Sequence, residues 1–361
     1  MKLRISKYDN LSLFICLFGS ILAPATKTKE TYFCCARTQI CYQKYNQKMR
    51  RIPVHILTGF LGAGKTTFLN HFIRSHQSER LFIIENEVGK ENIDGGLLME
   101  VDEIVELTSG CLCCSLNDKL LDVLEEASLR REEYDRIIIE TTGIADPSNI
   151  AAAFVSNPMV ERVFDLINVI CITDAVHISE WLQETEEARR QLVMADFVLL
   201  NKTDLLDEEQ IERSCQLVKA ITPYAKVYRG SHGIFPIEPI LTTHQSKLDE
   251  RVLVAQASGD TEAHDIKTVV LYYDQKFNLQ ALGYELKRLL FLHAHQIYRI
   301  KGIIATDHPQ RVIVQSVAKN FVFTSGEAWE EGQKRQAKIV CIGKSVEKKA
   351  IDKIFQRALQ R

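Results

Sequence analysis

The stretch from Gly59 to Thr66 reads G-F-L-G-A-G-K-T, and it constrains the fold more than any other part of the chain. It stands between the apolar run 54–57 and the helix-like segment 67–73. The spacing G-x-x-x-x-G-K-T is that of the P-loop, in which glycines let successive backbone N–H groups face one point at the start of a helix. The sequence therefore predicts a strand, a phosphate-binding loop and a helix.

This loop supplies a set of predicted nucleotide contacts. Lys65 would reach the β- and γ-phosphate oxygens and is the predicted catalytic cation, while the Thr66 hydroxyl would join the shell of a Mg²⁺ ion. The full predicted set is Gly59, Gly62, Ala63, Gly64, Lys65, Thr66 and Thr67. The alternative is an ordinary glycine-rich turn between a strand and a helix, which would bind nothing.

Composition narrows the class of protein. With 361 residues and 46% apolar content, the chain can bury a sizeable core, and two domains are expected. A formal net charge of −2 argues against nucleic acid as a partner, because phosphate backbones are bound through a net basic surface. We also expect no membrane span, since no apolar run in the sequence reaches the required length.

The first 48 residues have the features of a targeting sequence. Lys2, Arg4 and Lys7 precede an apolar run at 11–18, and A-P-A follows at 23–25, as in a secretory signal peptide. An organelle-targeting sequence fits the basic character equally. We favour an appended start, because Met49 lies directly before the first core strand. Residues 1–48 are therefore left out of the predicted fold, and a cytoplasmic protein is expected.

Two further predicted strands end in acids. The apolar run 81–84 leads into E-N-E-V-G-K at 85–90, where a nucleotide-dependent switch segment would lie. The run 137–139 ends at Glu140, and Gly143 follows three residues later, which is the Walker B arrangement. Glu140 could hold Mg²⁺ through water or orient the attacking water, and the Gly143 backbone could sense the γ-phosphate.

The motif N-K-T-D at 201–204 predicts the base that is bound. It follows the apolar run 197–200. The Asp204 carboxylate could accept both donors of guanine, Asn201 could meet O6 and N7, and Lys202 would lie along the base plane. Adenine would leave that carboxylate unpaired, which gives strong discrimination. The alternative is an ordinary helix cap with Asp204 exposed.

Periodicity predicts two domains. Strands and helices alternate from 52 to 228, including one helix over 178–194, which indicates an α/β P-loop domain of three layers with a mostly parallel sheet over residues 49–241. A polar linker is expected at 242–265. A smaller α+β domain over 266–361 would hold a helix at 278–295 and a closing helix capped by Ser345. Its predicted strands are 268–273, 298–304, 311–317, 321–323 and 338–342.

Three of the ten cysteines fall within four residues, at Cys111, Cys113 and Cys114. Thiolates select Zn²⁺, Cu⁺ or iron over Mg²⁺ and Ca²⁺. In an extended loop the first two point one way and the third the other, so a four-coordinate site would need a carboxylate such as Glu85 or a second chain. A buried thiol cluster and a redox pair are the alternatives. Three scattered cysteines are expected in the core, namely Cys171, Cys215 and Cys341.

Five ordered motifs resemble those of the CobW family of metallochaperone GTPases. They are T-G-F-L-G-A-G-K-T-T at 58–67, E-N-E-x-G at 85–89, G-C-L-C-C at 110–114, E-T-T-G-x-A-D-P at 140–147 and N-K-T-D at 201–204. This family is similar to the nickel-insertion GTPases of urease and hydrogenase maturation. The sequence departs from the family's usual N-E-F-G-E at Val88 and Lys90, and Lys90 puts a cation where the family has a potential ligand.

The resemblance implies GTP hydrolysis with Mg²⁺ and a transition metal, most often zinc, that is passed to a client metalloprotein. It implies Lys65, Thr66 and Glu140 for phosphate and Mg²⁺, Asn201 and Asp204 for guanine, and Cys111, Cys113 and Cys114 for the metal. Turnover is expected to be slow, because no arginine finger is evident and a client or a second copy in a homodimer would complete the site. Two rivals are a regulatory GTPase with structural cysteines and a metal buffer that binds GTP without hydrolysing it.

Overall fold

A computed structural model describes residues 50–86, 103–106, 115–244, 266–293, 295–344 and 346–360 of the chain. The chain divides into two compact units, Met1–Arg50 and Arg51–Arg361, and all the described helices and strands belong to the second. Among these residues, none of the helices combines the length and the apolar character that crossing a lipid bilayer requires.

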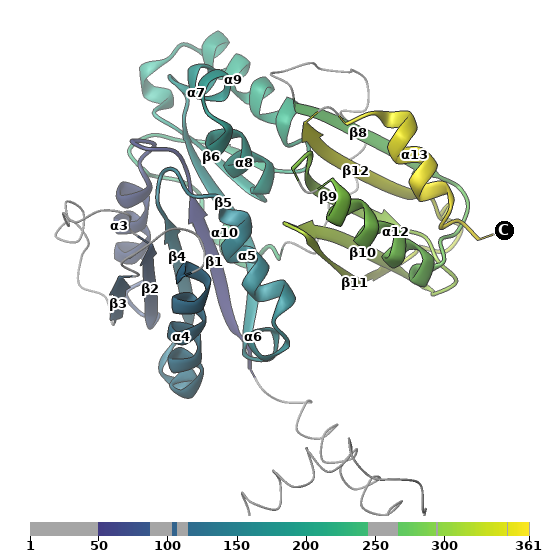
Figure 1. Ribbon diagram of the computed structural model, residues 1–361. Coiled ribbons are helices and arrows are strands. Elements are labelled where there is room, and N and C mark those ends of the chain that lie inside the picture. The colour runs from purple at the N-terminus through teal and green to yellow at the C-terminus, as the bar shows by residue number, and fades with distance from the viewer. Residues whose placement is uncertain are drawn as a thin grey trace, which may run out of the picture. The chain divides into compact units, whose positions relative to one another are not determined.

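A seven-stranded sheet forms the centre of the first domain (Figure 1), and every pairing within it is parallel. The strand order is β3-β2-β4-β1-β5-β6-β7. The strands are β1 (Ile52–Thr58), β2 (Leu81–Asn86), β3 (Glu103–Glu106), β4 (Arg136–Thr141), β5 (Phe164–Asp174), β6 (Phe197–Asn201) and β7 (Lys226–Arg229). The predicted parallel α/β fold is therefore confirmed.

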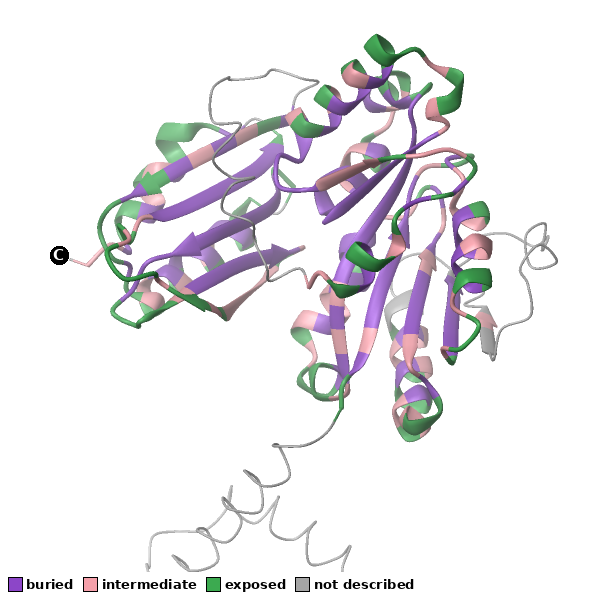
Figure 2. Ribbon diagram, turned by 180° about the vertical axis from the view of Figure 1, so that it is seen from behind, coloured by how far each residue is buried: buried purple, intermediate pink, exposed green. Residues whose placement is uncertain are grey.

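Helices cover both faces of this sheet. They are α3 (Lys65–Ser75), α4 (Ser115–Leu129), α5 (Pro147–Ser156), α6 (Pro158–Val163), α7 (Ile178–Glu184), α8 (Glu186–Met194), α9 (Glu208–Ile221) and α10 (Ile237–Thr242). Ile56 of β1 packs with α4 and α5, whereas its neighbour Leu57 packs with α3 and α10. Because successive strand residues point to opposite faces, the central strands are apolar on both sides and buried (Figure 2).

The prediction of one helix over 178–194 is wrong. Helix α7 ends at Glu184 and α8 begins at Glu186, because Thr185 between them has extended dihedrals (φ −124°, ψ 131°). Both the N–H and the hydroxyl of Thr185 donate to the Trp181 carbonyl at 2.9 Å. A β-branched residue that can bond the preceding turn favours such a break. The run 183–187 is polar throughout and contains no glycine or proline, so the sequence did not mark the break.

The second domain is an antiparallel sheet of order β11-β10-β9-β12-β8 with two helices packed on one face (Figure 1). Its elements are β8 (Ile266–Tyr273), α12 (Leu279–Leu292), β9 (Ile297–Ile304), β10 (Gln310–Val317), β11 (Asn320–Ala328), β12 (Ala337–Lys344) and α13 (Lys348–Gln356). The predicted α+β class is confirmed. Strand β11 is longer than expected, and α13 has Glu347 at its N-cap position, two residues after the predicted cap. Ser345 lies outside the described residues.

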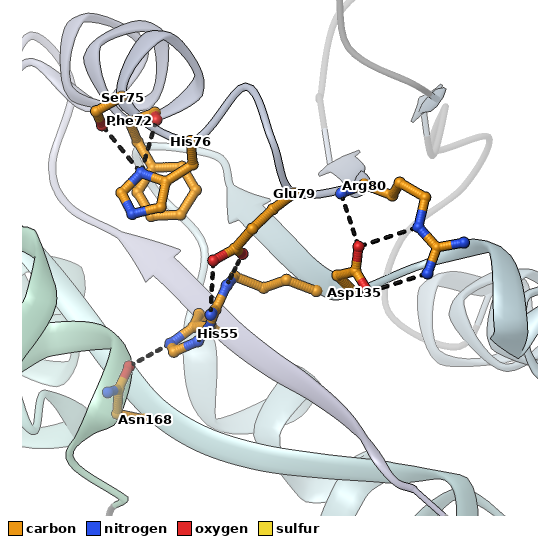
Figure 3. A network of polar contacts seen from close by, with 9 residues as sticks. His55, Phe72, Ser75, His76, Glu79, Arg80, Asp135 and Asn168 are labelled. Carbon is orange, nitrogen blue, oxygen red and sulfur yellow. Dashed lines mark hydrogen bonds and ion pairs between the residues drawn. The ribbon is translucent and has the colours of Figure 1, made fainter.

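A polar network crosses the amino-terminal half of the parallel sheet (Figure 3). The guanidinium of Arg136 donates to His55 Nε2 at 2.7 Å and to Glu79 at 2.8 Å, so the other ring nitrogen of His55 donates to Asn168 Oδ1 at 2.9 Å. Burial, aided by the charge of Arg136, lowers the pKa of His55 to about 3. His55 is therefore a neutral, fully hydrogen-bonded core residue.

Candidate functional site

The loop after β1 has the backbone geometry of a phosphate cradle. Gly59, Gly62 and Gly64 have φ angles of 150°, 73° and 104°, a region that L side chains rarely adopt. A Cβ on Gly59 would lie 2.2 Å from the Ile172 carbonyl oxygen, and one on Gly64 would lie 2.4 Å from Asn201 Nδ2. These contacts explain the glycines at both positions, and the loop leads directly into the start of α3, the end of a helix that favours an anion.

Lys65 is the first residue of α3, and its ammonium group lies over this loop. Its Nζ donates to the Gly59 carbonyl at 2.9 Å and to the Phe60 carbonyl at 3.5 Å. Thr66 is half-buried beside it, and Thr67 is exposed. The cation and the hydroxyl predicted for phosphate and Mg²⁺ are therefore placed together at one helix start.

Two carboxylates stand in neighbouring strands at the carboxyl edge of the sheet. Glu140 of β4 is the register partner of Glu85 in β2 and of Leu57 in β1. Ile138 and Ile83 lie two residues before these carboxylates in the same strands, and both pack with α3. Because residues two apart in a strand point to the same face, Glu140 and Glu85 lie on the face of the sheet that α3 covers. This position is compatible with the Mg²⁺ role of Glu140, which stays a prediction.

The segment from Gly143 to Asp146 leaves β4 and touches the glycine loop. A Cβ on Gly143 would lie 2.7 Å from the backbone nitrogen of Leu61, which shows how closely the two loops approach. Asp146 accepts from the Ser148 N–H at 2.9 Å and caps α5, with Pro147 in the first turn. The backbone expected to sense the γ-phosphate is therefore beside the loop expected to bind it.

Asn201 joins the P-loop to the segment after β7. Its buried side-chain amide donates to the Ala63 carbonyl at 3.0 Å, and its side-chain oxygen accepts from the Gly233 N–H at 3.3 Å. Both polar groups thus contact backbone, which favours a role in holding the pocket together. A direct contact with guanine stays a prediction.

Lys202 has a partner that sequence reasoning missed. Its Nζ lies 2.8 Å from Oδ2 of Asp174, a carboxylate that is 1% exposed at the end of β5. Asp174 also accepts from the Val176 N–H at 2.8 Å and contacts His177 Nδ1 at 3.0 Å. Burial acts to raise the pKa of Asp174, yet the hydrogen bonds from Lys202, His177 and Val176 hold it below its ordinary value. An acid that ends a buried parallel strand was the available signal.

Asp204 lies on a 3₁₀ turn (Thr203–Leu205), partly exposed and 3.6 Å from His232 Nε2. The residue that caps α9 is Asp207, whose carboxylate accepts from the Gln210 N–H in a capping box. Asp204 is therefore not needed as a helix cap. His232, in a loop with φ 54°, is a second residue near the predicted base site that the sequence did not single out.

Only one of the predicted metal ligands lies among the residues that the structure describes. Cys111, Cys113 and Cys114 lie outside the described residues, whereas Glu85 is described and buried. Within the described ranges, no group of three His, Cys, Asp or Glu side chains could hold a metal ion. Of the cysteines expected in the core, Cys171, Cys215 and Cys341 are all buried thiols, and burial raises the pKa of Cys171 to about 12.

Comparison with known proteins agrees with this geometry. The family described as CobW/HypB/UreG, nucleotide-binding domain, matches residues 53–229, and the cobalamin synthesis protein cobW C-terminal domain matches 266–359. The zinc chaperone YjiA of Escherichia coli is 33% identical over 304 residues, covering 82% of this chain and 95% of that protein. The chain belongs to the CobW family.

A further relative and a solved structure of YjiA give the same assignment. The zinc-regulated GTPase metalloprotein activator 1 of Dictyostelium discoideum is 31% identical over 232 residues, with 54% of this chain and 48% of that protein covered. A crystal structure of Zn(II)-bound YjiA GTPase from E. coli superposes with a TM-score of 0.68 at 28% identity, covering 86% of this chain and all of that one. The fold and the order of the two domains are therefore those of the family.

Proposed function

We propose that this CobW-family protein hydrolyses GTP and uses the reaction to deliver a transition metal, zinc in the first instance, to a client metalloprotein. The observation that carries the proposal is the bond from Asn201 to the Ala63 carbonyl. It ties the predicted guanine-binding motif to the phosphate loop. This bond supports the proposal because it holds two motifs 138 residues apart in sequence next to each other.

The residues around this pocket suit GTP and Mg²⁺. Backbone N–H groups at the start of α3 and the Lys65 ammonium would bind the phosphates. Thr66 and Glu140 would hold Mg²⁺ or its water shell, and the magnesium ion would neutralise charge that develops on the γ-phosphate. The Asp204 carboxylate would select guanine over adenine.

The metal part of the proposal rests on chemistry and on relatives. Thiolates at Cys111, Cys113 and Cys114 suit zinc, which is cargo here, and Glu85 is the proposed fourth ligand. Strand β3 ends at Glu106, the register partner of Glu85, so the cysteines follow in sequence from the strand edge where Glu85 and Glu140 stand. The names of YjiA and of the metalloprotein activator refer to zinc. A cytoplasmic location, which keeps thiols reduced, belongs to the same proposal, and so does a homodimer as one way to complete the site.

Metal titration in the two nucleotide states tests this function. The full chain would be titrated with Zn²⁺ in the presence of Mg²⁺ and either GDP or a non-hydrolysable GTP analogue. We expect tighter zinc binding with the analogue, because γ-phosphate contacts would order the loops that carry the ligands. Equal affinity in both states would remove the coupling, and no phosphate release with metal and client present would leave a metal buffer.

Matched cysteine variants assign the metal site. Cys113→Ser should weaken zinc binding strongly, whereas Cys215→Ala changes a buried thiol far along the sequence and should leave it unchanged. A Cys113→Ser protein that binds zinc as tightly as the parent would favour a regulatory GTPase with structural cysteines.

A further inference from the structure

Helix α8 holds the segment Gly143–Asp146 through a residue that the sequence did not mark. Gln191, 1% exposed, donates its side-chain amide to the carbonyls of Gly143 at 3.0 Å and Ala145 at 3.1 Å. Its Oε1 is buried and receives no hydrogen bond within the described part of the chain. Leaving a buried oxygen without a donor costs free energy. An apolar residue would avoid that cost, so the two bonds to the segment are the reason for a glutamine here.

The next residue of α8 holds the other end of the same segment. Arg190 Nη1 donates to Asp146 Oδ2 at 3.0 Å, and its Nε and Nη2 donate to Glu186 Oε1 at 3.0 and 2.7 Å. Asp146 in turn caps α5. Two adjacent side chains of one helix therefore hold both ends of the segment that is expected to sense the γ-phosphate.

Strand β9 of the second domain holds α8 at both of its ends. The Tyr298 hydroxyl donates to Glu186, the first residue of α8, at 3.3 Å, and its ring lies 4.9 Å from the Arg190 guanidinium carbon. Arg299 Nη1 donates to the carbonyl of Met194, the last residue of α8, at 2.6 Å. Consecutive residues of one strand thus fix the start and the end of the helix.

A cavity of about 190 Å³ adjoins this junction and is lined by Asp146, Arg190, Met194, Tyr298 and Lys319 among others. Protein interiors are otherwise close-packed and transmit small displacements. Because close packing is interrupted beside the pair of Arg190 and Asp146, the contacts of Arg190 with Glu186 and Tyr298 are what hold its guanidinium in place.

We propose that Gln191 and Arg190 are positioning residues for GTP hydrolysis and that β9 fixes them through α8. This inference rests on the proposed GTPase function. The Gly143 N–H can meet a γ-phosphate only in one orientation of the segment, and the bonds from Gln191 to the flanking carbonyls set that orientation. The second domain therefore contributes to the γ-phosphate response without touching the nucleotide.

The test is Gln191→Met in the full chain, which keeps the length of the side chain and removes its donor. We expect kcat for GTP to fall about 10-fold or more, and affinity for a non-hydrolysable GTP analogue to fall about 5-fold. Affinity for GDP should stay within about 2-fold, because GDP lacks the group that the segment contacts. A purely structural role for Gln191 would change the affinities for both nucleotides together.

Neighbouring variants provide the controls. Arg189→Ala removes a guanidinium on the same helix that contacts the Leu182 and Gln183 carbonyls, so it should leave the ratio of analogue to GDP affinity unchanged. Arg190→Gln and, more weakly, Tyr298→Leu should lower that ratio as Gln191→Met does.

Two results would overturn the inference. One is a folded Gln191→Met protein with parental kcat and parental affinity ratio. The other, if that variant does not fold, is a parental ratio in both Arg190→Gln and Tyr298→Leu. An unmodified protein that neither hydrolyses GTP nor distinguishes the analogue from GDP would instead refute the proposed function itself.

Discussion

The two ends of the parallel sheet both carry buried polar side chains, and they use them differently. Near the amino ends of the strands, His55, Arg136, Glu79 and Asn168 bond mainly to one another and to the chain that packs there. At the carboxyl ends, Asn201, Gln191 and the Asp174 carboxylate bond to loop backbone. The side chains of the first network bond mainly within that network, whereas those of the second hold loop backbone in place.

This difference separates stability from function. A closed network of buried groups stabilises the fold because each member would otherwise lose a hydrogen bond without water to replace it. Side chains that hold loop backbone instead orient N–H groups and cations toward a ligand. Changes at the amino end should therefore alter unfolding, and changes at the carboxyl end should alter nucleotide binding or turnover.

The largest effect is expected from acidifying the amino-end network. His55 is 1% exposed, and its pKa is lowered from 6.5 to about 3. The folded protein keeps it neutral while the unfolded chain takes up a proton below pH 6.5, so stability is complete above that pH and falls as the pH drops toward 3. The loss is about 3 kcal/mol by pH 4.5 and about 4 kcal/mol by pH 3. Urea unfolding between pH 7.5 and 4.5 measures it.

His55→Gln should be less stable at neutral pH and show a much flatter pH dependence over that range. His308→Gln changes an exposed histidine and should keep the slope of the parent. Equal slopes for the parent and His55→Gln would mean that the histidine is not buried in its neutral form.

At the carboxyl end, Lys65→Ala should reduce kcat for GTP by roughly 10² to 10³-fold, because it removes a charge aimed at the transferring phosphate. Its free energy of unfolding should change little, since Lys65 is half-buried beside a loop. Lys349→Ala on the exposed side of α13 is the control for general loss of charge. A Lys65→Ala protein that unfolds more easily yet turns over GTP normally would reverse the comparison drawn between the two ends.

The sequence predicts those parts of the site whose role depends only on residues close together in the chain. The glycine loop, the cap at Asp146 and the strands that carry Glu85 and Glu140 near their carboxyl ends were all predictable, because spacing within a few residues defines them. The parallel and antiparallel sheets also follow from the order of strands and helices.

The sequence could not predict the side-chain contacts between residues that are far apart in the chain. Gln191 reaches Gly143 across 48 positions, and Lys202 meets Asp174 across 28. Neither residue type is unusual where it stands, since a glutamine in an amphipathic helix is ordinarily exposed. The break at Thr185 was missed because neither glycine nor proline marks it, and the bonds to Trp181 that close the first helix cannot be read from the polar run 183–187.

A smaller effect is expected from Asp174→Asn at the carboxyl end. The change removes the buried charge that holds the Lys202 ammonium, so the lysine is no longer fixed beside the base site. We expect KM for GTP to rise about 10-fold with little change in kcat, as for a charge-assisted hydrogen bond that acts on binding. Asp207→Asn is the matched control, because asparagine caps a helix as well as aspartate does. An unchanged KM would leave Asp174 with a structural role only.

The smallest effect is expected from changing an exposed ion pair at the amino end of the sheet, and it is compared with a change in the buried network there. Arg80 makes a two-pronged ion pair with Asp135 at 3.0 Å, but its side chain is 47% exposed, against 13% for Arg136. Because solvent screens exposed pairs, Arg80→Ala should cost less than about 1 kcal/mol. Arg136→Ala should cost about 1–3 kcal/mol, since it leaves the buried Nε2 of His55 without its donor. Urea unfolding of the two variants at pH 7.5 decides the matter. Equal costs would mean that the geometry of the ion pairs, and not the burial of their partners, gives this end of the sheet its stability.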